Sequence, residues 1–83
     1  MVELDYVGRE DCPLCDELLA ALLPWAHEHG VRVACRDVDA DPEDRRRYGH
    51  KVPVVLLDGL VVASGHLDID ELARLVRPRA SAR

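Results

Sequence analysis

The feature that most constrains the fold is an apolar run from Val52 to Leu57, interrupted only by Pro53. A run in which both alternating positions are apolar is typical of a strand buried on both faces. Asp58-Gly59 follows at once and is a strong two-residue hairpin signal, so residues 60–63 are predicted to return as a neighbouring strand. A strand buried on both faces requires cover on each side of its sheet.

The rest of the chain is patterned to supply that cover. Alternating apolar residues predict strands over residues 2–7 and 31–38. A helix is predicted with Asp11 or Cys12 as its cap and Pro13 in its first turn. Pro24 is expected to kink or end it near Leu23 because proline lacks the N–H of an internal hydrogen bond. The apolar stripe of this helix comprises Leu14, Leu18, Leu19, Leu22, Leu23 and Trp25.

Two more helices complete the prediction. A short one is capped by Asp39 or Asp41, with Pro42 in its first turn, and a last one follows Asp68. The order is β-α-β-α-β-β-α, which predicts an α/β fold (α+β in its mixed pairing): a four-stranded mixed sheet with helices on both faces. Residues 1–78 are expected to form one domain, and 79–83 a short frayed tail.

Composition limits the partners and the compartment. The net charge of −5 argues against nucleic-acid binding, and no apolar run approaches the ~20 residues that span a membrane. The N-terminus shows no signal-peptide pattern. Three cysteines, an odd number, do not suit a disulfide scaffold. We therefore expect a cytoplasmic protein, monomeric, with neither nucleic-acid nor membrane partners.

Cys12-Pro13-Leu14-Cys15 is the candidate site. If the helix starts at Pro13, Cys12 lies at its N-terminal cap, where the amides of Leu14 and Cys15 and the helix dipole favour a thiolate. Cys12 would attack a substrate disulfide, and the more buried Cys15, or an outside thiol, would resolve the mixed disulfide.

The acidic neighbours of the pair act in the opposite direction. Glu10, Asp11, Asp16 and Glu17 flank the cysteines, so we predict that the pKa of Cys12 is lowered less than in a basic active site. A CxxC pair can also be half of a zinc site. Cys35 and scattered histidines would then have to complete it, so redox chemistry is favoured and no metal is predicted.

These motifs resemble the glutaredoxins of the thioredoxin-fold superfamily. The resemblance rests on Val7–Cys15, Tyr48-Gly49, Lys51-Val52-Pro53-Val54 and Ser64-Gly65-His66-Leu67-Asp68, and is greatest to short glutaredoxin-like proteins with a Cys-x-Leu-Cys site. It implies a thioredoxin/glutaredoxin-like fold over nearly the whole chain. It also implies that Pro53 is cis beside the cysteines, leaving the backbone of Val52 to pair with substrate. The alternative is a trans proline at an edge or strand start.

The resemblance further implies a glutathione site. Arg9 would pair with a glutathione carboxylate, and Gly65 and Asp68 would hold its γ-glutamyl end. The alternatives are a solvated charge for Arg9 and a plain helix cap for Asp68. Leu14, Lys51 and Ser64 depart from the usual tyrosine, threonine and glycine, which puts glutathione use in doubt. The implied substrate-binding residues are Arg9, Leu14, Val52, Pro53, Gly65 and Asp68.

The function expected is that of a thiol–disulfide oxidoreductase with Cys12, Pro13 and Cys15 at its centre. It would reduce protein or small-molecule disulfides, or glutathione mixed disulfides, with no bound cofactor. Glutathione as co-substrate, or a thioredoxin-reductase-type enzyme, would return the electrons. The alternative is a non-catalytic redox-sensing or binding module, or an iron–sulfur carrier.

Four other features receive simpler interpretations. Cys35 is expected to be a small buried residue, with a regulatory thiol as the alternative. Trp25 is expected in the core, Arg45–Arg47 on a solvated helix face balanced by acids, and His50 and His66 at the surface.

Overall fold

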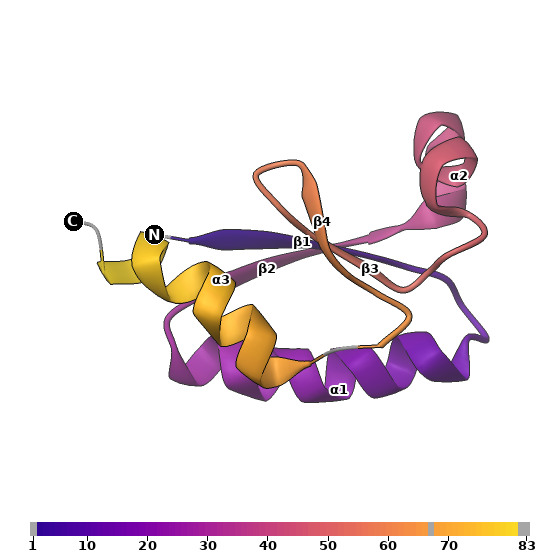
Figure 1. Cartoon of the computed structure of the whole chain (residues 1–83). Helices are drawn as coiled ribbons and strands as arrows, with labels where there is room; N and C mark the ends of the chain where they lie inside the picture. Colours follow the sequence, from indigo (N-terminus) through magenta and orange to yellow (C-terminus); the bar gives the residue numbers. More distant parts are fainter. Residues whose placement is uncertain (1, 67, 82–83) are drawn as a thin grey trace.

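A four-stranded mixed sheet in the order β2-β1-β3-β4 forms the centre of the protein (Figure 1). We analysed a computed structural model, which describes residues 2–66 and 68–81, with side chains up to Val76. The elements are β1 (Glu3–Gly8), α1 (Pro13–Glu28), β2 (Arg32–Asp37), the 3-10 turn η1 (Val38–Ala40), α2 (Pro42–Tyr48), β3 (Val54–Leu57), β4 (Leu60–Ser64) and α3 (Ile69–Ser81). The predicted element order and sheet class are confirmed.

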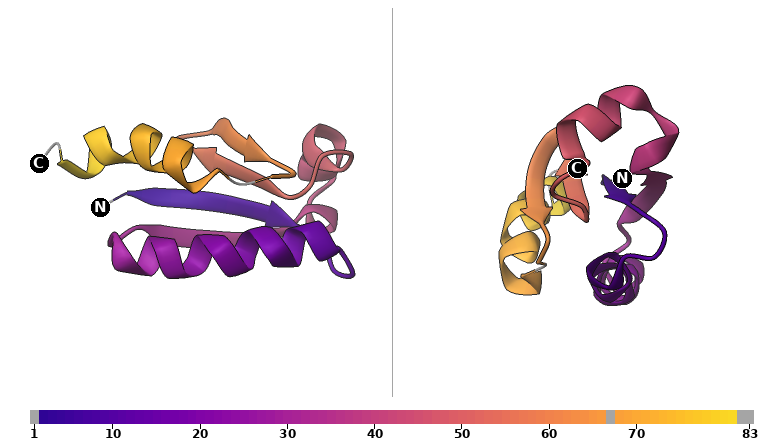
Figure 2. Two further views of the ribbon diagram at one scale, coloured as in Figure 1. Left: turned by 60° about the horizontal axis from the view of Figure 1, so that its bottom comes forward. Right: turned by 90° about the vertical axis from the view of Figure 1, so that its right-hand side faces the viewer.

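The central strands β1 and β3 are covered on both faces. β1 runs parallel to β2 and antiparallel to β3, and β3 runs antiparallel to β4. Helices α1 and α3 lie on one side of the sheet and α2 on the other (Figures 1 and 2). All four residues of β3 are buried, as the uninterrupted apolar run predicts.

Alternation along the central strands divides the core in two. Leu4 and Tyr6 of β1 pack with Val55 and Leu57 of β3 toward α1 and α3. On the other face Val7, Val38, Val54 and Leu56 form a smaller cluster, against which Tyr48 of α2 packs. Successive side chains of a strand point to opposite faces, so the apolar run of β3 supplies both clusters.

The predicted hairpin is present. Asp58 and Gly59 both have positive φ, 52° and 81°, as a two-residue turn matched to the strand twist requires. This turn brings β4 back beside β3 and carries the chain to Gly65 at the end of the sheet near the cysteine pair.

Two helices continue past a proline, so of the two effects expected of Pro24, a kink or an end near Leu23, the end is wrong. α1 continues through Pro24 to Glu28 instead of ending near Leu23. Pro24 and Ala20 lie on the exposed side of the helix, so water can satisfy the Ala20 carbonyl that loses its partner. α3 likewise continues to Ser81, into the stretch predicted as a tail. Residues 82–83 of that tail, and Leu67 of the glutaredoxin-like motif, lie outside the described residues.

Candidate functional site

Cys12 lies at the N-terminus of α1, as predicted. It is the N-cap residue, with extended backbone angles, and Pro13 occupies the first turn where no N–H partner is needed. The preceding residue, Asp11, has a left-handed backbone (φ 56°), which aspartate tolerates better than most residues. This turn directs the chain from the end of β1 into α1.

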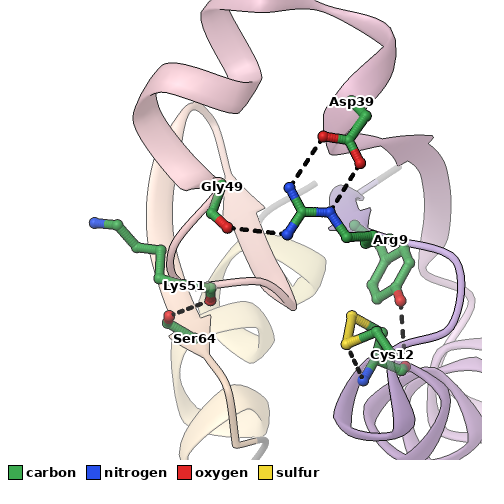
Figure 3. The surroundings of a disulfide bond; sticks show 8 residues. Arg9, Cys12, Asp39, Gly49, Lys51 and Ser64 are labelled. Carbon is green, nitrogen blue, oxygen red and sulfur yellow. Dashed lines mark hydrogen bonds and ion pairs between the residues drawn. A yellow bond between two sulfur atoms is a disulfide. The ribbon is translucent and has the colours of Figure 1, made fainter.

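Cys12 and Cys15 form a disulfide with their Cα atoms 5.2 Å apart. The backbone N–H of Cys15 donates to Sγ of Cys12 over 3.2 Å (Figure 3). Cys12 is half-buried and Cys15 is buried, so the predicted difference in their exposure is confirmed. The sulfur of Cys12 is therefore reachable, and it already accepts a hydrogen bond from an amide at the start of the helix. This hydrogen bond favours the thiolate of Cys12 after reduction. The pKa predicted for reduced Cys12 stays a prediction.

Tyr6 makes a hydrogen bond to the cysteine pair that the sequence did not predict. Its hydroxyl donates to the carbonyl oxygen of Cys15 over 3.2 Å, linking β1 to the first turn of α1. Burial, followed by the nearby Cys35 and Asp16, raises the pKa of Tyr6 above 10.0. The alternation of β1 predicts that Tyr6 faces the core on the side of Leu4, but not which carbonyl its hydroxyl meets.

The segment ending in Pro53 borders the same core as the cysteine pair, because Val52 packs against the cluster that contains Cys15. The Val52–Pro53 peptide bond is cis, the conformation implied by the glutaredoxin resemblance. Pro53 is buried, and its carbonyl accepts the N–H of Gly65 over 2.7 Å. The Ser64 hydroxyl donates to the carbonyl of Lys51 over 2.9 Å (Figure 3). Ser64 and Gly65 thus fasten residues 51–53 to the end of β4.

Arg9 is ion-paired within the protein, although its side chain remains 37% exposed. Its guanidinium donates from Nε and Nη2 to the two carboxylate oxygens of Asp39, over 2.8 and 3.0 Å. Its Nη1 donates to the carbonyl of Gly49 over 3.2 Å (Figure 3). The hydrogen bond to Asp39 raises the pKa of Arg9, and the same bond lowers the pKa of Asp39. Arg9 therefore ties the loop before Cys12 to the segment that leads to Pro53.

Asp68 has the helix-capping contacts. Its Oδ1 accepts the backbone N–H groups of Asp70 over 3.0 Å and of Glu71 over 3.2 Å at the start of α3. This is the arrangement of an N-cap, the simpler of its two interpretations.

A shallow groove of about 230 Å³ runs beside the cysteine pair on the side of Gly65. Leu14, between the two cysteines, is 54% exposed and lines it. The other lining residues are Glu17, Leu18, Ala21, Gly65 and His66. Of the six residues expected to bind substrate, Leu14 and Gly65 meet in this groove, Val52 and Pro53 lie in the segment fastened to Gly65, and Asp68 follows at the start of α3. Arg9 is bonded elsewhere.

The prediction that Cys35 is buried is wrong, because it is an exposed free thiol. It lies opposite Tyr6 on β2, the edge strand, and lines a second groove of about 370 Å³ with Asp16 and Leu19 of α1. The N-terminal end of α1 leaves this edge of the sheet uncovered. Partial desolvation nevertheless raises the pKa of the Cys35 thiol above its ordinary value.

The other side chains interpreted from the sequence lie as predicted. Trp25 is buried in the main cluster and stacks on His29, with ring centroids 4.8 Å apart. Arg45–Arg47 lie on an exposed helix face and pair with Asp39 and Glu43. His50 and His66 are exposed. Within residues 2–66 and 68–81, no three His, Cys, Asp or Glu side chains are grouped to hold a metal, and no helix is long and apolar enough to cross a membrane.

Comparison with known proteins agrees with this geometry. The sequence model described as "Glutaredoxin-like domain (DUF836)" matches residues 3–77. The chain belongs to this family. The match covers every strand, the cysteine pair, the cis proline and most of α3, so the glutaredoxin-like domain accounts for nearly all of the described fold.

Solved structures show the same fold. A Nitrosomonas europaea protein determined by NMR is 25% identical, with a TM-score of 0.76 over 89% of both chains. An X. campestris structural-genomics target is also 25% identical, with a TM-score of 0.71 over 90% of this chain and 96% of that one. A mutant thioredoxin from Halobacterium salinarum is 28% identical, with a TM-score of 0.70 over 99% of this glutaredoxin-like chain and 77% of the other. The fold is thioredoxin-like. No curated protein sequence matches the chain significantly.

Proposed function

We propose that this glutaredoxin-like protein is a thiol–disulfide oxidoreductase that reduces polypeptide disulfides through Cys12 and Cys15. The observation that carries the proposal is the asymmetry of the pair at the start of α1. Cys12 is reachable and its sulfur accepts the N–H of Cys15, whereas Cys15 is buried. A thiolate at this position is stabilised by the helix terminus, and the thiolate is the attacking species.

The proposed reaction is two successive exchanges. The Cys12 thiolate attacks one sulfur of the substrate disulfide, and the other substrate sulfur leaves as a thiolate that takes a proton. The Cys15 thiolate then attacks Sγ of Cys12 and releases the second substrate thiol. The substrate gains two electrons and two protons, and the protein is left with its Cys12–Cys15 disulfide. An external thiol or a thioredoxin-reductase-type enzyme, in a reducing compartment such as the cytoplasm, would restore the dithiol.

Residues 51–53 and their hydrogen bonds support a place for the substrate backbone. Proline has no N–H, and the peptide group before it, that of Val52, is free to pair with an extended segment. Residues 51–53 are held by Ser64 and Gly65 beside the disulfide. The halobacterial relative is named a thioredoxin, which agrees with disulfide chemistry at this pair.

Three cysteine variants test the proposal. The purified protein is reduced and assayed with a peptide disulfide, with Cys35→Ser as the matched control outside the pair. Cys12→Ser should abolish turnover, Cys15→Ser should accumulate a mixed disulfide visible as the added mass of one substrate thiol, and Cys35→Ser should retain the rate.

Turnover that persists in Cys12→Ser would refute the proposal. A wild-type protein without turnover, purified with a visible chromophore or a bound partner, would instead favour the non-catalytic module or the iron–sulfur carrier.

A further inference from the structure

The cation and amides that would hold glutathione are already bonded within the protein. Arg9 uses three of its five N–H donors on Asp39 and Gly49. A carboxylate from outside would have to displace Asp39 from an existing two-point pair, exchanging one carboxylate for another. A carboxylate ligand would therefore add little binding energy at Arg9.

The start of α3 is similarly occupied. The N–H groups of Asp70 and Glu71, which face the helix terminus, both donate to Oδ1 of Asp68. Amides at a helix start attract an anion only while they lack another partner. A ligand carboxylate at this terminus would have to compete with the protein's own cap.

Four unpaired carboxylates lie close to the cysteines in the chain. Within the described part of the chain, the carboxylates of Glu10, Asp11, Asp16 and Glu17 are exposed and make no hydrogen bond or ion pair. The nearby Lys51 side chain points away from the disulfide (Figure 3). Carboxylates gathered around a site repel an anion and draw in a cation. Glutathione carries two carboxylates and one amine, so the site disfavours it.

The groove beside the disulfide suits a basic side chain. Leu14, Leu18 and Ala21 give it apolar walls, and Glu17 also lines it. Lysine and arginine lay an aliphatic stem on apolar surface and keep the charged head in water or against a carboxylate. A residue of this kind placed near a substrate cysteine would lie along Leu14 and reach Glu17.

We infer that the substrate is a polypeptide disulfide with a lysine or arginine beside its reactive cysteine, and that glutathione disulfide is a poor substrate. This inference rests on the proposed function and names the substrate class of the same site. The step and its electron balance are those given above, with the protein dithiol as the reductant.

The test compares matched substrates in a single turnover. The protein is reduced with dithiothreitol, desalted and mixed with one of three short peptides that differ only in Lys, Ala or Glu beside a cysteine. Each cysteine is joined by a disulfide to the same neutral thiol, and glutathione disulfide is the fourth substrate. At an ionic strength near ~20 mM, the Lys peptide should react about fivefold to tenfold faster than the Glu peptide. At ~0.5 M salt the ratio should fall below about twofold because the charges are screened.

Variants of Glu17 locate the effect. Glu17→Gln should lower the preference for the Lys peptide by about twofold to threefold, and Glu17→Lys, which changes the charge by two units, should remove most of it. The matched control is Glu28→Gln, an exposed glutamate roughly 16 Å farther along the same helix, which should leave the preference unchanged.

Two outcomes overturn the inference in distinguishable ways. Equal rates for the Lys and Glu peptides, or a faster reaction with glutathione disulfide, would refute the substrate class while leaving the oxidoreductase intact. Failure to reduce even the uncharged Ala peptide would refute the proposed function, and the substrate class with it.

Discussion

We predict that replacing Gly8, at the end of β1, with alanine destabilises the protein because the added methyl group would clash with Tyr6. A methyl group at position 8 would lie 2.6 Å from Cζ and 2.8 Å from Cε2 of the Tyr6 ring, well inside van der Waals contact. Tyr6 is buried, so its ring cannot swing into solvent without leaving the core. The ring would have to shift, and its hydroxyl would then lose the carbonyl of Cys15.

The expected cost of Gly8→Ala follows from these two effects. Overpacking a core site costs about 1–3 kcal/mol, and losing a buried hydrogen bond costs about 1 kcal/mol. Together they predict a loss of about 2–4 kcal/mol in the free energy of unfolding, and a melting temperature roughly 10–20 °C lower. Gly8 does not have positive φ, so the cost is not one of backbone conformation.

The assay is urea unfolding of the oxidised protein in a double-mutant cycle with Tyr6→Leu. Without the ring, Gly8→Ala should cost less than about 1 kcal/mol, giving strong coupling between the two positions. Gly59→Ala is the control: Gly59 has φ 81° and no atom within 4 Å of an added methyl group, so it should cost about 1–2 kcal/mol in either background. The same cost for Gly8→Ala with and without the ring would refute the clash.

Three further predictions concern groups near the site. Because burial raises the pKa of Tyr6 above its unfolded value of 10.0, its neutral form contributes stability that is complete below pH 10 and is lost as the pH rises through the folded pKa. Tyr6→Phe should thus flatten the fall of unfolding free energy above pH 10, and an unchanged slope would contradict this. Arg9→Lys keeps the charge but loses the two-point geometry, so hydrogen exchange at the amides of Lys51 and Gly65 should accelerate; unchanged protection would show that Arg9 does not hold that segment. In the oxidised protein, iodoacetamide should add once, at Cys35, with a rate midpoint above pH 9.0, and a midpoint below that value would count against partial desolvation of the thiol.

Local patterns predicted the elements because each has its own chemical signal. The apolar run of β3, the Asp58-Gly59 turn and the proline at the start of α1 each determine a local conformation irrespective of the rest of the chain. The same local logic placed Cys12 at the helix cap and Cys15 beneath it. The prediction that Pro24 could end the helix shows the limit of local patterns, because the cost of a helix proline depends on whether water can reach the freed carbonyl.

The contacts that complete the site are not local. Arg9 is bonded to residues 30 and 40 positions away, and Tyr6 to one nine positions away. No spacing rule connects Arg9 with Asp39, because their encounter depends on how η1 and α2 turn at the end of the sheet. Cys35 was misplaced for a related reason: alternation predicts which face of β2 it occupies, but not that the helix on that face leaves the edge uncovered.

Because β2 is an edge strand, a strand of another molecule could pair with it. The side chains of β2 reduce this risk. A strand that ends a sheet presents backbone groups to which the strand of another molecule could add, the first step in aggregation. Here that border carries Arg32, Arg36 and Asp37, all exposed, and Arg36 is further anchored to Asp44 of α2. Bringing a second β2 alongside would bring ionised groups together and strip their hydration. These charged residues therefore oppose the addition of a second strand, and they are also what makes β2 too polar for the interior of the sheet.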